Sequence, residues 1–224
     1  MKSIGILGGM GPEATAELYM RLIEAFQARG AIYDEDFPSI YIYNLPAPDV
    51  AERENEILSL LVDGLKKLQE MGSEILAIPC NTATCIIDKN EDIPGFVSIV
   101  KETVKKIKEY NYKKVGLLST KLTLKTEIYQ SLLKKEGVEL ILPTEMETIE
   151  ITKIILNILS GKKLPSDKMS LEKIAFEMIK KGADAVILGC TELPLIFTNS
   201  SIRTIDTVQI LTEALIRKTI EQRE

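Results

Sequence analysis

Short apolar runs rich in β-branched residues alternate along this chain with longer stretches in which apolar residues recur at helical spacing. The short runs predict β-strands at residues 3–7, 39–43, 74–78, 96–99, 114–118, 138–142, 185–188 and 203–205. The longer stretches predict helices at residues 12–29, 52–71, 82–90, 101–110, 124–136, 144–159, 166–181 and 207–222. Such alternation is typical of α/β folds, in which parallel sheets are covered by helices on both faces.

The strand pattern of the first half recurs in the second. Residues 4–7 resemble residues 115–118 after a shift of 111 positions, and residues 72–82 resemble 182–191 after a shift of 110. A third pair of segments, 97–99 and 204–206, corresponds more loosely. We therefore predict two similar α/β lobes, residues 1–100 and 101–207, with a last helix at 208–224 that packs back on the first lobe. Each lobe is a parallel sheet flanked by helices, the lobes are pseudo-symmetric, and the active site is expected in the cleft between them.

Composition narrows the class of protein. The chain has 224 residues, of which 45% are hydrophobic and 27% charged, as is usual for a globular protein. Its formal net charge of −5 argues against a nucleic-acid partner, because phosphate contacts need clustered Lys and Arg. No apolar run has the length of a membrane span, and the first residues do not resemble a signal peptide. We predict a cytoplasmic protein without a membrane partner, whose thiols stay reduced.

The sequence contains no histidine. This excludes histidine-based triads, histidine general bases and histidine metal ligands. Of the three cysteines, Cys80 and Cys85 lie five positions apart, which matches no common zinc-binding spacing. We therefore expect no metal site.

Two cysteines occupy equivalent positions in the repeat. Cys80 and Cys190 each follow a predicted strand, precede a polar turn and are expected to open a helix. A helix N-terminus lowers the pKa of a thiol toward neutrality, which suits a general acid or base. Two thiols on opposite faces of a carbon acid could invert its configuration, because one removes the α-proton and the other returns a proton. Cys85 fits a buried structural residue instead.

The turns after these cysteines could hold an anion. Asn81, Thr82 and Thr191 offer backbone N–H groups and short polar side chains suited to a carboxylate. The alternative is that Asn81 and Thr191 are only N-cap residues. Ser119 and Thr120 form a third polar turn at the same expected edge of the sheets.

Three segments resemble signatures of the aspartate/glutamate racemase family: residues 7–12 (LGGMGP), 79–83 (PCNTA) and 189–192 (GCTE). The resemblance covers essentially the whole chain. It implies two pseudo-symmetric lobes, a homodimer, a small amino-acid substrate and no pyridoxal phosphate, metal or other cofactor, with Cys80 and Cys190 as the catalytic acid and base. Implied for substrate binding are Met10, Asn81, Thr82, Ala83, Ser119, Thr120, Thr191 and Glu192, with Asp49, Val50 and Arg53 as further loop candidates.

The chain departs from the family pattern at positions where relatives bind the side chain of the substrate. Aspartate-specific relatives carry an arginine at the position of Val50 and a lysine at that of Leu159, and the usual histidine after the first cysteine motif is Thr84 here. Neighbouring cations at positions 53, 162 and 163 could substitute. Aspartate and glutamate are the first expected substrates, and a broader set of amino acids stays open.

Other functions are compatible with parts of the sequence. Residues 9–14 fit the dinucleotide fingerprint G-x-G-x-x-A, which would indicate a nucleotide-binding regulatory module. Against it, Pro12 removes an N–H from the turn, and Asn44 stands where a ribose-binding acid is expected. A maleate-type isomerase or another dicarboxylate-acting enzyme, such as a decarboxylase, and a duplicated scaffold without catalysis are the remaining alternatives.

Overall fold

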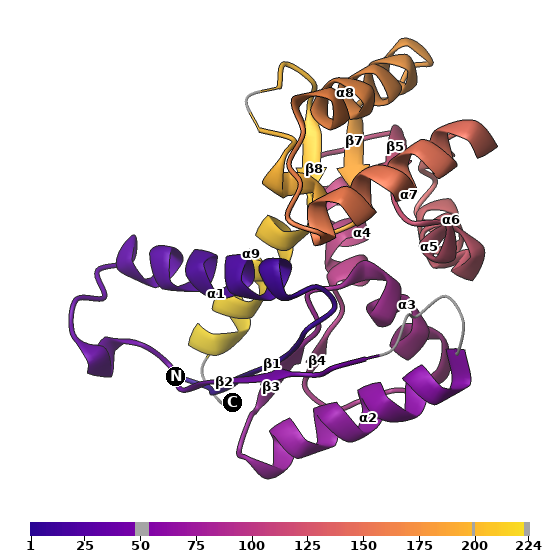
Figure 1. The fold of residues 1–224 in the computed structure, drawn as a ribbon. Helices are drawn as coiled ribbons and strands as arrows, with labels where there is room; N and C mark the ends of the chain where they lie inside the picture. Colours follow the sequence, from indigo (N-terminus) through magenta and orange to yellow (C-terminus); the bar gives the residue numbers. More distant parts are fainter. Residues whose placement is uncertain (48–53, 199, 222–224) are drawn as a thin grey trace. The chain divides into compact units, whose positions relative to one another are not determined.

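The protein is described by a computed structural model covering residues 1–47, 54–198 and 200–221. The chain divides into two compact units, here called unit 1 (Met1–Glu102 with Val208–Glu224) and unit 2 (Thr103–Thr207). Each unit contains a four-stranded parallel sheet flanked by helices (Figure 1). The α/β class with two parallel sheets, predicted from the sequence, is confirmed.

Unit 1 has the strand order β2-β1-β3-β4. Its core joins the sheet to α2 and α3 through apolar side chains such as Leu7, Leu61 and Ile86. Figure 1 shows α2 below this sheet and α1 and α9 above it. The elements are β1 (Ile4–Gly8), α1 (Pro12–Gln27), the 3-10 helix η1 (Asp34–Asp36), β2 (Ile40–Asn44), α2 (Glu54–Glu70), β3 (Ile75–Ala77), α3 (Asn81–Asn90), β4 (Phe96–Val97), α4 (Ile99–Glu109), which continues into unit 2, and α9 (Thr207–Ile220).

Unit 2 repeats this arrangement with the strand order β6-β5-β7-β8. One core cluster joins its sheet to α7 and α8 and includes Leu118, Ile154 and Leu171. The elements are β5 (Lys114–Leu118), α5 (Lys121–Thr126), α6 (Ile128–Lys135), β6 (Glu139–Ile141), α7 (Glu145–Leu159), α8 (Pro165–Lys180), β7 (Ala185–Leu188), the 3-10 helix η2 (Leu193–Leu195) and β8 (Thr204–Asp206).

The two sheets share their register as well as their order. Gly5 of β1 lies opposite Leu76 of β3, and Gly116 of β5 lies opposite Val186 of β7. These are the residue pairs that the 111- and 110-position shifts relate. The sequence repeat is therefore a structural duplication.

An acidic side chain joins the same two strands in each unit. Glu74 Oε2 accepts a hydrogen bond from the Ser3 N–H at 3.1 Å, and Asp184 Oδ2 accepts from the N–H groups of Lys113 and Lys114 at 2.7 and 3.0 Å. The two backbone donors hold the pKa of Asp184 below its usual value.

We expect Asp184→Asn to lower the free energy of unfolding by up to about 1 kcal/mol at pH 7, since the charge-assisted bonds are lost from an exposed site. A carboxyl with a depressed pKa in the folded state stabilises above its unfolded pKa of about 4, and this contribution disappears as the pH falls through the folded value. Urea titrations at pH 7 and pH 3 check this, and the difference between the variant and wild type should be smaller at the lower pH.

The helix predicted at 124–136 is wrong in its boundaries. The chain forms α5 and α6, separated by Glu127 in the left-handed conformation with φ 57°. Thr120 caps α5, which moves the start forward to Lys121, and the Thr126 hydroxyl donates to the Thr123 carbonyl at 2.7 Å. Such local side-chain bonds compete with a continuous helix.

The other predicted elements are found with boundaries shifted by one to a few residues. β4, for example, covers only Phe96–Val97 of the predicted 96–99. Among the described residues, no helix combines the length and hydrophobicity that crossing a membrane requires.

Candidate active site

In unit 1, Cys80 lies at the point where strand β3 passes into helix α3. It is the N-cap residue of α3, with extended backbone angles (φ −154°, ψ 115°), and its carbonyl accepts from the Thr84 N–H at 3.0 Å. The alternative in which Asn81 is the N-cap is wrong, because Asn81 is the first helical residue. The thiol therefore belongs to the residue at the N-terminal end of α3, where the partial positive charge of the helix dipole favours an anion.

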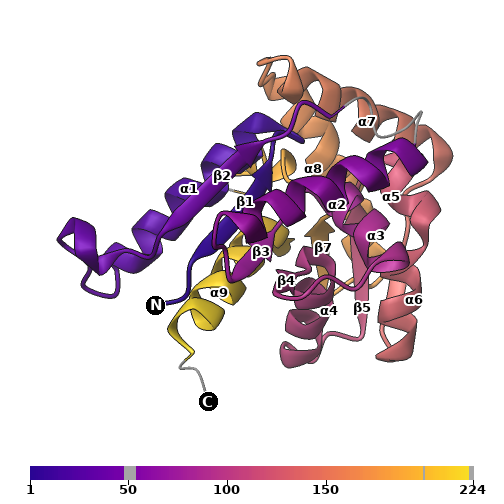
Figure 2. The same cartoon turned by 90° about the horizontal axis from the view of Figure 1, so that it is seen from below.

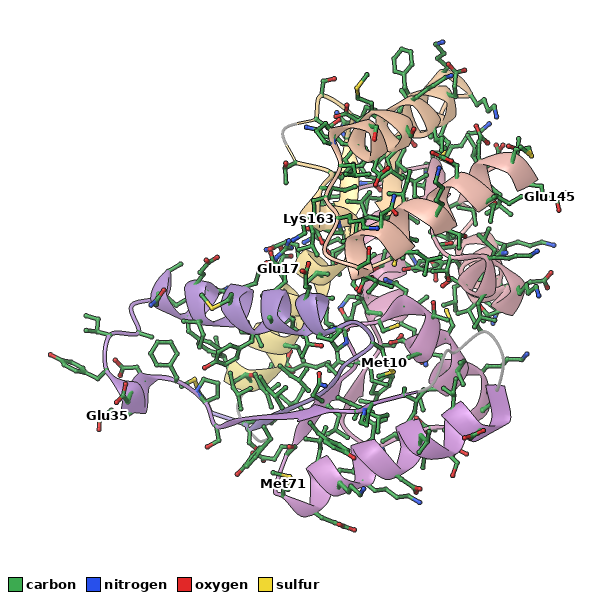
Figure 3. All side chains as sticks on the ribbon, in the orientation of Figure 1. Met10, Glu17, Glu35, Met71, Glu145 and Lys163 are labelled. Carbon is green, nitrogen blue, oxygen red and sulfur yellow. The ribbon has the colours of Figure 1, made fainter. Side chains whose placement is uncertain are left out.

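The residues predicted around Cys80 gather at this edge of the sheet. Asn81, Thr82 and Ala83 form the buried first turn of α3. Met10, in the turn between β1 and α1, packs with Cys80 against the same apolar core (Figure 3). The structure thus brings these residues together within unit 1.

The β1–α1 turn depends on Gly9, which has φ +98°. A Cβ atom on Gly9 would lie 2.4 Å from the Leu45 carbonyl oxygen. The Gly9 N–H donates to Thr15 Oγ1 at 3.1 Å, which fixes the turn on the first helical residues of α1. The glycine pattern that resembled a dinucleotide fingerprint therefore has a structural function here.

In unit 2, Cys190 lies just beyond β7 and is 8% exposed. Its thiol donates a hydrogen bond to Glu192 Oε2 at 2.9 Å, and the Thr191 hydroxyl lies 3.3 Å from the same oxygen. Glu192 is only 3% exposed. The second cysteine is thus coupled directly to a buried carboxylate, a contact that the sequence reasoning did not predict although the spacing in Gly-Cys-Thr-Glu permits it.

The prediction that Cys190 opens a helix is wrong. A hydrogen-bonded turn follows, in which the Leu193 N–H donates to the Cys190 carbonyl at 3.1 Å, and then the three-residue 3-10 helix η2. Residues 198–201, Thr-Asn-Ser-Ser, have side chains that favour turns over a continued helix. Consequently Thr191 is no N-cap, and Cys190 lacks the helix N-terminus that Cys80 has.

Ser119 and Thr120 lie at the end of β5, the strand next to β7. The Gly189 N–H donates to the Leu118 carbonyl at 2.7 Å, and a Cβ atom on Gly189 would lie 3.2 Å from Ser119 Cβ. Ser119 is therefore adjacent to the segment that carries Cys190. Thr120 is the N-cap of α5, and its hydroxyl accepts from the Thr123 N–H at 3.2 Å.

Two further threonines support these turns and were missed by the sequence reasoning. Buried Thr207 donates from Oγ1 to the Leu188 carbonyl at 3.0 Å, immediately before Gly189 and Cys190. Buried Thr123 lies with its hydroxyl 3.1 Å from that of Thr120. The sequence feature that could have identified these two threonines is their position after or near the end of a predicted strand.

The other residues that the sequence singled out lie at other places in the fold or fall outside the described residues. Asp49, Val50 and Arg53 fall outside the described residues. Leu159 is the last residue of α7 and half-exposed, and Lys162 and Lys163 lie in the turn between α7 and α8. Buried Cys85 lies within α3, as predicted. In the described part of the chain, no group of three or more Cys, Asp or Glu side chains is arranged to hold a metal ion.

Comparison with known proteins returns amino-acid racemases. Residues 7–215 match the family model described as Asp/Glu/Hydantoin racemase. The chain is 31% identical to the broad specificity amino-acid racemase RacX of Bacillus subtilis, over 95% of this chain and 96% of the relative.

Solved structures give the same result. The Picrophilus torridus aspartate racemase superposes with a TM-score of 0.82 at 27% identity, covering 100% of this chain and 96% of that one. An aspartate racemase homologue from Pyrococcus horikoshii gives a TM-score of 0.79 at 29% identity, covering 99% and 100%. A glutamate racemase from Francisella tularensis, at 17% identity and a TM-score of 0.70, shares the fold.

Proposed function

Because this chain belongs to the Asp/Glu/hydantoin racemase family, we propose that it interconverts the L- and D-enantiomers of amino acids by two-base proton transfer between Cys80, Cys190 and the α-carbon. The family makes the enzyme an isomerase of the amino-acid racemase class. The single observation that carries the mechanism is the occurrence of one thiol at the same position of each duplicated sheet, directly after β3 and after β7.

The surroundings of the two thiols differ, and we assign them different resting states on that ground. Cys80 is the N-cap of α3, where partial positive charge favours the thiolate form. Cys190 donates its proton to the Glu192 carboxylate, a contact that requires the thiol form and disfavours its ionisation. In the resting enzyme Cys80 is then the base and Cys190 the acid, and the roles exchange after each turnover.

The mechanism needs no cofactor. The thiolate of Cys80 takes the α-proton from one face and becomes a thiol, while the thiol of Cys190 gives its proton to the other face and becomes a thiolate. The buried N–H groups and hydroxyls of Asn81, Thr82 and Thr191 would bind the α-carboxylate, whose negative charge grows when the α-carbon is deprotonated.

Aspartate and glutamate are the first substrates to test. Val50 and Leu159 replace the cations with which aspartate-specific relatives bind the side-chain carboxylate. We therefore propose a specificity that extends beyond acidic side chains, in keeping with 31% identity to a broad specificity racemase.

A panel of L- and D-amino acids, incubated without added pyridoxal phosphate and separated by chiral chromatography, tests the function. We expect enantiomer conversion of aspartate or glutamate and of at least one neutral amino acid. Maleate included in the panel tests the dicarboxylate isomerase alternative, which the family assignment does not favour. Conversion of maleate without racemisation of any amino acid would refute the proposal.

A further inference from the structure

In each unit, a threonine hydroxyl donates to the backbone carbonyl that lies two residues before the cysteine. In unit 2, Thr207 Oγ1 donates to the Leu188 carbonyl at 3.0 Å. In unit 1, Thr84 Oγ1 donates to the Ile78 carbonyl in a longer bond of 3.4 Å. Ile78 and Leu188 are related by the 110-position shift of the repeat. The same carbonyl is therefore bound by a threonine in both duplicated sheets.

The two threonines do not correspond to each other in the repeat. Thr84 belongs to α3, and the 110-position shift places its counterpart at Pro194. Thr207 is the first residue of α9, and its counterpart is Val97. Neither counterpart has a hydroxyl group. The shared bond is thus no by-product of the duplication, and it indicates a structural requirement at the carbonyl before each cysteine.

Burial shows that the hydroxyl group matters at both positions. Thr84 and Thr207 are each 0% exposed. In unit 1, α3 packs against α2 through apolar side chains (Figures 1 and 2). A buried hydroxyl destabilises a fold unless it is hydrogen-bonded, and valine would have the same shape without that cost. The bond to the carbonyl is what offsets the burial of each threonine hydroxyl.

The carbonyl of each cysteine is bound as well. The Thr84 N–H donates to the Cys80 carbonyl at 3.0 Å, and the Leu193 N–H donates to the Cys190 carbonyl at 3.1 Å. The three-residue segments 78–80 and 188–190 are therefore each bonded at their first and their last carbonyl. Bonds at both ends restrict the backbone of the segment, and with it the direction in which the cysteine side chain projects.

We infer that Thr84 and Thr207 are positioning residues, which hold the thiols of Cys80 and Cys190 in the direction that proton transfer requires. The inference rests on the proposed function, because it takes these two thiols as the reacting groups. Each threonine acts through the backbone of its cysteine segment and needs no contact with the substrate. Such positioning has a large effect on rate, since a displacement of about 1 Å can slow a reaction about 100-fold.

Thr207→Val tests the inference in unit 2, because it keeps the shape of the side chain and removes the donor. It should lower kcat for racemisation by about 10- to 100-fold. Thr207→Ser restores the hydroxyl and should recover most of the activity. Thr212→Val is the matched control, since Thr212 is 1% exposed and its hydroxyl donates to the Val208 carbonyl at 2.8 Å, inside α9. It should leave kcat near that of wild type.

Exchange of the α-hydrogen with solvent deuterium shows which thiol is displaced. Thr207→Val disturbs the segment of Cys190, so exchange catalysed by Cys80 should persist for one enantiomer while racemisation falls. Thr84→Val should lower the exchange that Cys80 catalyses, by a smaller factor because the bond of Thr84 is longer. A general loss of stability would lower the exchange of both enantiomers by the same factor.

A crystal structure of Thr207→Val tests the inference without any measurement of activity. The thiol of Cys190 lies 2.9 Å from Glu192 Oε2 in the wild-type chain. This distance should lengthen beyond hydrogen-bonding range in Thr207→Val and be kept in Thr207→Ser. If Thr207→Val does not fold, Thr207→Ala, which also removes the hydroxyl, takes its place in each measurement.

The results that would overturn the inference are distinct from those that would refute the proposed function. A wild type that racemises no amino acid refutes the proposed function, and the distance between Cys190 and Glu192 in the variants still decides whether Thr207 positions the thiol. An unchanged distance, an unchanged kcat in a folded Thr207→Val, or an equal loss of kcat in Thr212→Val would each overturn the inference.

Discussion

Replacing either Cys80 or Cys190 with serine is expected to lower kcat/KM for racemisation by about 10³-fold or more. Serine keeps the size of the side chain, but its hydroxyl is a far weaker acid than a thiol and cannot act as the base at neutral pH. Because two enantiomers have equal free energy, kcat/KM must fall equally in both directions. Chiral chromatography from each pure enantiomer measures this.

Isotope exchange separates the functions of the two thiols. Cys190→Ser retains Cys80 as the base and should still exchange the α-hydrogen of one enantiomer with solvent deuterium. Cys80→Ser leaves Cys190, whose thiol donates to Glu192. If this contact disfavours the thiolate, as we propose, exchange of the other enantiomer should appear only at raised pH. Exchange of the same enantiomer in both variants would contradict the two-base assignment.

Cys85→Ser is the matched control for these substitutions. Cys85 is completely buried in α3, five residues after Cys80. Its replacement buries a hydroxyl and should cost about 1 kcal/mol of stability, while kcat/KM stays near that of wild type. A loss of racemisation comparable to that of Cys80→Ser would show that the effect comes from disturbing α3.

Glu192→Gln is expected to lower racemase activity by about 10- to 100-fold at neutral pH, because the hydrogen bond to a charged group contributes about 1.5–3 kcal/mol. The amide preserves the shape of the side chain but removes the charge that keeps the proton on Cys190. Cys190 should then ionise at lower pH, and the basic limb of the pH profile of kcat/KM should move to lower pH.

Asp167→Asn controls for the loss of a buried carboxylate in unit 2. Asp167 is 7% exposed and accepts from Asn157 at 2.9 Å, within the α7–α8 pair. We expect it to change stability and leave the pH profile where it was. If Glu192→Gln also leaves the profile unchanged, Glu192 has no influence on the proton of Cys190.

The sequence predicted those features that depend on local patterns. The apolar runs identified the strands, because a parallel strand that is buried on both faces requires such a run. The repeat then assigned Cys80 and Cys190 to equivalent strand ends. The break at Glu127 and the turn after Cys190 were not predicted. Both depend on hydrogen bonds between side chain and backbone, or within a tight turn, which hydrophobic periodicity does not report.

The sequence predicted which residues belong to the candidate site better than it predicted the contacts between them. Resemblance to a family identified Glu192 as a candidate for substrate binding, whereas the structure shows its carboxylate bonded to the thiol of Cys190. That pairing arises because the turn at residues 190–193 folds the side chain of Glu192 back two positions along the chain. The repeat alone would give the two cysteines the same surroundings. The hydrogen bond from Cys190 to Glu192 is what makes their surroundings different.

The central claim is that both thiols act on one α-carbon. A crystal structure with a bound amino acid or a non-reactive analogue tests it most directly. We predict that Sγ of Cys80 and Sγ of Cys190 lie on opposite sides of the α-carbon, each within about 3–4 Å of it. A ligand held with both sulfurs on the same side of the α-carbon, or with either sulfur beyond reach of it, would contradict the account.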